Sequence, residues 1–363
     1  HARLFTGEIP GRQVQVVSLN MRICFLNNDL RDDTGAGRFC LNLIMSLKKA
    51  DPLLEVKVLT TAGSGHPWEG AIIPARKFGM IFALPKIRRI LRNFDIIHAL
   101  DGYPYGVIAV LASLGLGKKV IITAIGTGAI QPLYGYWGWL LKWAYRRANA
   151  VAAISRYTSR EILKKVPGLD ITVINHAVEA EEFQGNPWQG VNDEHRERIE
   201  KLKPYMFSVG AAKGRKGFEY SIRAYYEIIR HIPQLNYLIL GTGGVTVEDL
   251  VRGLGLKKRI TFIRRVPRAV LVAMYRNAEL FMLLPHEVDK DVEGFGFVFL
   301  EAAAAELAVV GTLDSGAEDA VREGKNGYLV PPRDPQAAAA AVLKILKSPE
   351  LRKKFSKHSL QFA

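Results

Sequence analysis

Short runs of β-branched and aromatic residues alternate with helix-like stretches along almost the whole chain. The first series of strand-like runs covers residues 22–26, 56–59, 95–98, 120–123, 150–154 and 171–174. The second series covers residues 205–209, 237–240, 260–263, 280–284, 308–311 and 328–330. Strands that alternate with helices form right-handed βαβ units and parallel sheets. The pattern therefore predicts an α/β fold with two doubly wound, Rossmann-like domains.

The alternation is interrupted by a polar segment, residues 184–203, which holds two glycines, a proline and a charged run. We interpret it as the connection between a first domain, residues 21–190, and a second domain, residues 191–346. A helix over residues 347–363 is expected to pack back on the first domain. We expect Met21 to be the natural start, with residues 1–20 as upstream or added sequence. Ligands of open parallel sheets bind beyond the carboxyl ends of the strands, so the two domains are expected to face a central cleft.

The composition is that of a folded globular protein, because 48% of the 363 residues are hydrophobic and 23% are charged. No apolar run reaches the roughly 18 residues that span a bilayer, and no secretory signal is found. Cys24 and Cys40 form no metal or disulfide pattern, which favours a reduced, cytoplasmic protein. The net charge of +15 favours contact with polyanions or an anionic membrane. Since no nucleic-acid-binding module is recognisable, we expect no nucleic-acid partner.

The most informative local feature is a pair of glutamates, Glu293 and Glu301, on either side of a Gly-Phe-Gly turn. The turn, Gly294, Phe295 and Gly296, leads into an apolar and alanine-rich run that predicts a helix starting near Phe297. Backbone N–H groups at such a start favour anions, since they lack intrahelical partners and the helix dipole is positive there. Glutamates also serve as ordinary caps and solvated residues, so this pair alone does not define a site. Acidic acceptors around an anion-binding turn suit a ligand with both phosphates and hydroxyls, such as a nucleotide-sugar.

Two further glycine loops follow predicted strands. The loop around Gly35 follows the first strand and opens a helix, which lets the backbone approach a phosphate closely. The loop that begins at Gly210 carries Arg215 and Lys216, and it lacks the order of a Walker phosphate loop. Its cations suit a diphosphate, although a plain βα turn and a solvated basic turn remain the alternatives for the two loops.

Residues 289–291 read Asp-Lys-Asp, which matches a short metal motif of another class of sugar transferases. No histidine is placed to complete a metal site there, so we expect no metal and no other cofactor. His98 and Asp101, at the end of a predicted strand, are candidates for the acceptor side of the cleft. A packed histidine is the alternative for His98.

Taken together, these motifs resemble the retaining glycosyltransferases of the GT-B fold, in particular family four, the glycosyl transferases group one. The resemblance extends from Met21 to about Leu346. Its most specific element is the spacing of Glu293 and Glu301. The loop of residues 209–217, the segment 173–183 and the stretch 324–331 match further family motifs in the same order.

The resemblance implies a role for each candidate residue. Glu301 is expected to accept hydrogen bonds from the nucleotide ribose. Glu293 and the N–H groups of Phe295 and Gly296 are expected to hold the donor sugar. Lys216 is expected to neutralise the leaving diphosphate. The resemblance also implies retention of anomeric configuration, a UDP- or GDP-sugar donor, and a sugar or lipid-linked acceptor in glycoconjugate or cell-envelope polysaccharide synthesis.

The chain departs from the family pattern at two positions. Ala211 stands where an arginine is usual, and Ile125 stands where a histidine is common. These departures favour a second hypothesis, a catalytically silent relative that binds nucleotide-sugar or anionic lipid as a regulatory module. A nucleotide-sugar epimerase and a glycosidase fit the glutamate pair less well.

Two segments of the first domain suit a membrane surface. Residues 76–92 read as a basic amphipathic helix, and residues 134–147 interleave three tryptophans with a lysine and two arginines. Such faces lie in the interface of anionic membranes, although core aromatics with a solvated cationic rim give the same pattern. The sequence thus suggests a peripheral position on the inner face of the membrane.

Overall fold

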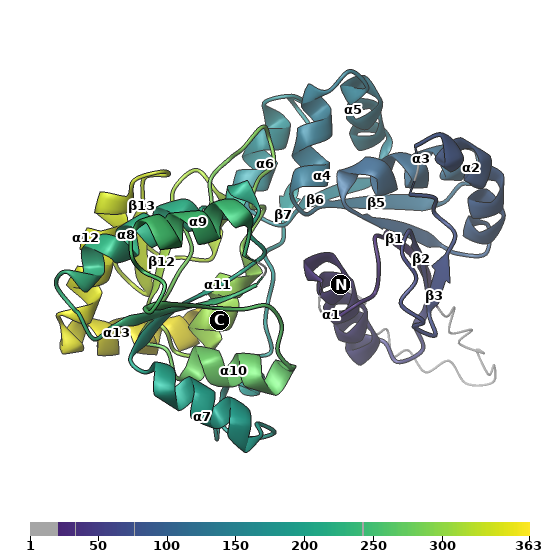
Figure 1. Ribbon diagram of the computed structural model, residues 1–363. Coiled ribbons are helices and arrows are strands. Elements are labelled where there is room, and N and C mark those ends of the chain that lie inside the picture. Colours follow the sequence, from purple (N-terminus) through teal and green to yellow (C-terminus); the bar gives the residue numbers. More distant parts are fainter. Residues whose placement is uncertain (1–20, 33, 76, 242) are drawn as a thin grey trace, which may run out of the picture.

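Two α/β domains, each built on a parallel sheet, make up the computed structural model (Figure 1). The structure describes residues 21–32, 34–75, 77–241 and 243–363. The prediction for residues 1–20, and the positions Asp33 in the predicted Gly35 loop and Arg76 in the predicted basic helix, lie outside the described residues. The predicted fold, two doubly wound Rossmann-like domains, is confirmed.

The first sheet has seven parallel strands in the order β3-β2-β1-β4-β5-β6-β7. The strands are β1 (Arg22–Asn27), β2 (Glu55–Thr60), β3 (Glu69–Ala71), β4 (Ile96–Leu100), β5 (Lys119–Ala124), β6 (Ala150–Ala153) and β7 (Thr172–Val173). The helices between them are α1 (Gly35–Ala50), α2 (Lys77–Leu91), α3 (Val107–Ser113), α4 (Thr127–Ile130), α5 (Gly138–Arg147) and α6 (Arg156–Leu163). The strand order reverses between β1 and β4, so the loops after these two strands diverge and leave a crevice.

The second sheet has six parallel strands in the order β10-β9-β8-β11-β12-β13. They are β8 (Tyr205–Val209), β9 (Asn236–Leu240), β10 (Ile260–Ile263), β11 (Leu280–Met282), β12 (Val309–Thr312) and β13 (Gly327–Val330). Its helices are α7 (Asp193–Leu202), α8 (Phe218–Ile229), α9 (Val245–Gly253), α10 (Arg268–Arg276), α11 (Phe297–Ala304), α12 (Pro335–Leu346) and α13 (Pro349–Phe362). Here the order reverses between β8 and β11. The loops that leave these strands are the two predicted ligand loops of this domain.

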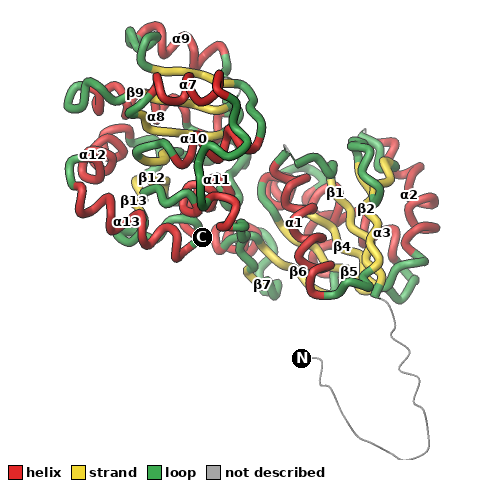
Figure 2. Tube along the Cα trace, turned by 90° about the horizontal axis from the view of Figure 1, so that it is seen from below, coloured by secondary structure: helices red, strands yellow, loops and turns green. Residues whose placement is uncertain are grey.

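Each sheet is covered by helices on both faces (Figure 1), and its central strands are largely buried, whereas the short edge strands β3 and β7 carry exposed residues. In the second domain the core is rich in aromatic rings, with Phe207, Tyr275, Phe281 and Phe299 in successive contact. Helix α1 of the first domain faces the second domain in both views (Figures 1 and 2). Side chains of α1 on one side and of the second domain's α10 and α11 on the other line a cavity between the domains.

Two segments differ from the sequence predictions. The charged run in the predicted connection folds as α7, and its Ile199 is buried in the second domain's core. The connection is therefore shorter than residues 184–203. The expectation that residues 347–363 pack on the first domain is wrong: α13 packs against α11 and α12 of the second domain. Phe355 enters that domain's core, and the Ser359 hydroxyl donates to the carbonyl of Leu307 at 2.7 Å.

Within the described residues, no helix is both long enough and apolar enough to cross a bilayer.

Candidate active site

The two ligand loops of the second domain leave neighbouring strands and so converge at one edge of the sheet. The loop after β8 runs through Gly210 to a short 3-10 turn at Gly214–Lys216. The loop after β11 ends at Gly296, whose φ of 80° is in the left-handed region that favours glycine, and α11 begins at Phe297. The predicted helix start is therefore confirmed. Glu301 lies in the second turn of this helix.

Glu293 is held by the cations of the neighbouring loop. Its Oε2 lies 2.8 Å from the Nζ of Lys216 and 3.7 Å from the Nε of Arg215. Arg215 also donates to the carbonyl of Val292 at 3.0 Å. Burial raises the pKa of Glu293, but Lys216 and Arg215 outweigh that effect, and its pKa lies below the ordinary carboxyl value. Glu293 is therefore an ionised acceptor at neutral pH, and Lys216 is a cation fixed beside it.

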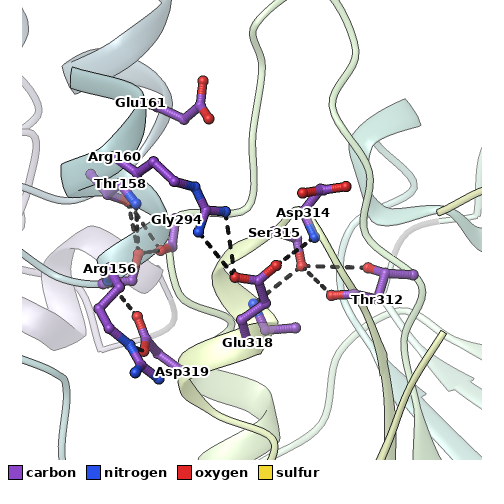
Figure 3. A network of polar contacts seen from close by, with 12 residues as sticks. Arg156, Thr158, Arg160, Glu161, Gly294, Thr312, Asp314, Ser315, Glu318 and Asp319 are labelled. Atoms are coloured by element: carbon purple, nitrogen blue, oxygen red, sulfur yellow. Dashed lines mark hydrogen bonds and ion pairs between the residues drawn. The ribbon is translucent and has the colours of Figure 1, made fainter. Parts of the chain in front are cut away.

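At Gly294 the backbones of the two domains lie in close contact. A Cβ built there would lie 1.9 Å from the carbonyl oxygen of Ile125, so only glycine fits. The Gly294 carbonyl accepts hydrogen bonds from the hydroxyls of Ser155 at 2.5 Å and Thr158 at 3.1 Å, both on the first domain (Figure 3). The N–H of Gly316 donates to the carbonyl of Glu293 at 2.8 Å. The backbone that carries Glu293 is therefore fixed from both domains.

Ion pairs on the same side hold the domains together. Arg156, at the start of α6, donates through its backbone N–H and its Nε to the buried carboxylate of Asp319 (Figure 3). Arg160, one turn on, lies 3.4 Å from Glu318. The hydroxyl of Thr127 donates to Asp291 at 2.5 Å.

Glu301 is buried, and both of its carboxylate oxygens have partners. Its Oε1 accepts from Arg38 of α1 at 2.8 Å and from Arg268 of α10, and its Oε2 accepts from the hydroxyl of Tyr275 at 3.0 Å. Arg268 also pairs with Glu182 through two nitrogens, each at 2.6 Å. The hydrogen bond between Glu301 and the nucleotide ribose stays a prediction. In this structure the Oε1 that could accept it is bonded to Arg38 and Arg268.

A cavity of about 750 Å³ opens beside this cluster, between the first domain and the start of α10. Charged and apolar side chains line it, among them Arg38, Glu179, Arg265, Arg268 and Phe297. Its position between the domains and its mixed lining suit a ligand that carries both hydroxyls and charge.

Of the first-domain candidates, His98 lies in the middle of β4 rather than at its end as predicted, and Asp101 directly follows that strand. Gly35 is the first residue of α1. His98 is packed, with its Nε2 2.8 Å from the hydroxyl of Thr123, and burial lowers its pKa to about 4. Asp101 has a φ of 117° and accepts from the N–H of Gly102 at 2.8 Å. Burial outweighs the surrounding N–H groups and raises the pKa of Asp101 to about 6.

Sequence reasoning did not single out Arg38, Ser155, Thr158, Arg268 or Asp319 as site residues. Ser155 directly follows the predicted strand 150–154 and caps α6, so its position at the edge of the sheet was a usable signal. The other four depend on contacts between distant segments.

No group of three or more histidine, cysteine, aspartate or glutamate side chains that could hold a metal ion is found in the described part of the chain. In the Asp-Lys-Asp motif, the Asp291 carboxylate accepts a hydrogen bond from the Thr127 hydroxyl and pairs with Arg215.

Two family models match the chain. Residues 34–182 match "Glycosyltransferase Family 4", and residues 191–362 match "Glycosyl transferases group 1". The chain belongs to glycosyltransferase family four and has the GT-B fold. The resemblance seen in the sequence is thereby confirmed.

Characterised relatives and solved structures agree with this assignment. The GDP-mannose-dependent alpha-(1-6)-phosphatidylinositol monomannoside mannosyltransferase of Mycolicibacterium smegmatis is 28% identical over 279 residues, covering 73% of this chain and 71% of the relative. The N-acetyl-alpha-D-glucosaminyl L-malate synthase of Bacillus anthracis is 26% identical, covering 72% and 68%. The structure of Anabaena HepE in complex with UDP-glucose has a TM-score of 0.76 over 94% of each chain at 18% identity, which supports the fold.

Proposed function

We propose that this glycosyltransferase is a retaining, metal-independent enzyme that moves a sugar from a nucleotide-diphosphate donor to a sugar or lipid-linked acceptor. The observation that carries the proposal is the contact between Lys216 and Glu293 in front of the first turn of α11. It combines an ionised acceptor for sugar hydroxyls, a cation for phosphate and the N–H groups of a helix start.

In the proposed reaction the bond between the sugar's anomeric carbon and the diphosphate oxygen breaks as a bond to the acceptor oxygen forms on the same face. A phosphate oxygen takes the acceptor's proton. Negative charge grows on the diphosphate as it leaves, so Lys216 and the helix N–H groups act most strongly in the transition state. Since protein groups supply this positive charge, the proposal needs no metal.

The donor is the first point to test. By name, the mycobacterial relative depends on GDP-mannose, and the Anabaena structure holds UDP-glucose. We therefore expect a thermal-shift panel of UDP-, GDP- and ADP-sugars to show stabilisation by a UDP- or GDP-sugar. With that donor, NMR of the product is expected to show the donor's anomeric configuration, and turnover is expected to survive EDTA. A product with inverted configuration would refute retention. Activity that EDTA removes and Mg²⁺ or Mn²⁺ restores would refute metal independence.

A second candidate is the silent relative, which Ala211 and Ile125 favour. The backbone carbonyl of Ile125 lies against Gly294, and its aliphatic side chain offers no hydrogen bond in place of a histidine's. Donor binding without transfer or hydrolysis across the panel would support this candidate over the enzyme.

An anionic membrane is the proposed surface for a lipid-linked acceptor. Helices α2 and α5 both pack against α3 and lie on one face of the first sheet (Figure 1). Exposed aromatic rings occur on α2 (Phe82, 84%) and directly before α5 (Tyr136, 89%, and Trp137, 61%), and the two helices also expose cations such as Lys86 and Arg146. Aromatic rings with interleaved cations suit the headgroup region of an anionic bilayer.

Flotation with phosphatidylcholine vesicles, with and without phosphatidylglycerol, tests this surface. We expect binding that requires the anionic lipid, falls with salt and is weakened in Phe82→Ser and Trp137→Ser. Tyr226→Ser, an exposed aromatic on α8 of the second domain, is the matched control. Equal flotation of all variants would show that this face is not the contact.

A further inference from the structure

Arg38 of the first domain forms an ion pair with Glu301, the buried carboxylate of the second domain. Arg38 lies in the first turn of α1, three residues after Gly35, and its NH1 is 2.8 Å from the Oε1 of Glu301. The Nε of Arg38 donates to the carbonyl of Asp32 at 2.9 Å, and its guanidinium lies 5.9 Å from the ring centre of Phe297. Arg38 therefore stands over the first turn of α11, on the wall of the cavity.

Arg38 is the partner that Glu301 can release most easily. Arg268 and Tyr275 come from Glu301's own domain, and Arg268 is fixed a second time by its paired contacts with Glu182. Arg38 reaches Glu301 across the cleft through one nitrogen, and within the described residues Glu301 is its one acidic partner. With Arg38 removed, the carboxylate keeps a charge partner in Arg268 and is not left buried and unpaired.

Two cations of the neighbouring loop are already paired with carboxylates. Lys216 is in contact with Glu293, and Arg215 is shared between Asp291 and Glu293. A diphosphate in front of α11 competes with these carboxylates for both side chains. Ala211, on the same loop, adds no charge. Arg38, across the cleft, presents a guanidinium that can turn from a carboxylate to a phosphate with the same charge-assisted geometry.

We propose that Arg38 is a donor-binding residue of the first domain that exchanges Glu301 for the donor's diphosphate when the nucleotide binds. This inference rests on the proposed function, because it requires a nucleotide-diphosphate donor. The exchange frees an oxygen of Glu301 for a ribose hydroxyl. In the exchanged state, the bound donor contacts Arg38 of the first domain as well as the second domain, so one ligand bridges both domains.

The exchange predicts opposite effects on two parts of the donor. In Arg38→Ala, Glu301 loses a competitor, so the affinity for a nucleoside is unchanged or increases. The diphosphate loses a charge-assisted partner, so the affinity for the nucleoside diphosphate falls by about 10- to 100-fold. Arg38→Lys keeps the charge without the planar fork and is expected to lie between Arg38→Ala and the wild type.

Calorimetric titration of the full chain with uridine, UDP, guanosine and GDP tests the exchange. Lys49→Ala is the matched control, because it removes the same charge from an exposed position of the same helix. Weaker diphosphate binding with unchanged or tighter nucleoside binding, in Arg38→Ala alone, supports the proposal.

Three results overturn it: both ligands bind more tightly, which makes Arg38 a mere competitor; both weaken equally, which makes its role structural; or neither changes. If the wild type binds neither UDP nor GDP, the proposed function fails as well. If the wild type binds one of them and the predicted split is absent, only the role of Arg38 is refuted.

Discussion

Adding a single methyl group at Gly294 is expected to separate the sugar-binding loop from the first domain. The new Cβ would lie 1.9 Å from the carbonyl oxygen of Ile125 and 2.8 Å from the Cα of Gly126. Ordinary contacts begin at 3.4 Å, so the first distance is short by about 1.5 Å. Both obstructing atoms are backbone, and the backbone of Gly316 packs against the same residue. No side-chain rotation can relieve the overlap, and the loop or the domain must move.

The size of that movement sets the expected effect on catalysis. A displacement of order 1 Å in a reacting group costs about 100-fold in rate, which is about 2.7 kcal/mol in the activation free energy. We therefore expect Gly294→Ala to lower kcat/KM by about 100-fold or more. The free energy of unfolding should fall by about 1–3 kcal/mol, as for other overpacked sites. Initial rates with the donor found in the panel, and urea unfolding, measure the two quantities.

Gly253→Ala is the matched control. Gly253 ends α9, its added Cβ meets no atom within 4 Å, and it lies outside the cleft. This variant is expected to keep full activity and at least wild-type stability. If Gly294→Ala retained a rate within a factor of two of wild type, the contact with Ile125 would not be what positions the loop.

The remaining predictions concern the charged residues of the cleft. Lys216→Ala should lower kcat more than donor affinity, which steady-state kinetics and donor titration would show. It should also lower the free energy of unfolding by about 3 kcal/mol in urea unfolding, because Glu293 is left with Arg215, at 3.7 Å, as its charge partner. Glu301→Ala should weaken donor binding, measured by calorimetry, because the nucleotide ribose loses the carboxylate that is proposed to accept its hydrogen bonds. The raised pKa of Asp101, about 6 against 3.8, means that the folded state binds its proton more tightly than the unfolded state. The resulting stability is present below about pH 4, and about 3 kcal/mol of it is lost as the pH rises to about 6. In urea unfolding between pH 4 and 7, the difference between wild type and Asp101→Asn should change by that amount, and a constant difference would contradict the shift.

The parts of the structure that local sequence determines were predictable. Strand and helix periodicity located all of the central strands, and the Gly-Phe-Gly turn before an apolar run placed the start of α11 at Phe297. The reason is physical: a left-handed residue at Gly296 and a buried helix directly after it are encoded within ten residues. For Lys216 and Glu293, the sequence could predict only that their loops lie close together, because the two loops follow neighbouring strands where the strand order reverses.

The contacts that join the domains were not predictable in this way. Arg38 and Glu301 are separated by 263 residues, and Ser155 and Gly294 by 139. No local pattern encodes which arginine reaches a given carboxylate. The charged run 193–201 was wrongly interpreted as part of the interdomain connection for a related reason. Its one buried side chain, Ile199, fixes α7 to the second domain, and the local charge pattern gives no sign of this.

The two sides of the domain interface differ in what their separation costs. At Gly294 the loop's carbonyl and the hydroxyls of Ser155 and Thr158 are buried together, so separation there breaks hydrogen bonds between buried groups and the close backbone packing at Ile125. Each buried polar group left without a partner costs about 1–3 kcal/mol. At Arg38 the contact is a single ion pair beside a cavity, where water or phosphate can replace the carboxylate. The fold thus holds the loop of Glu293 rigidly, while the side next to α1 keeps the contact that a ligand can most readily exchange.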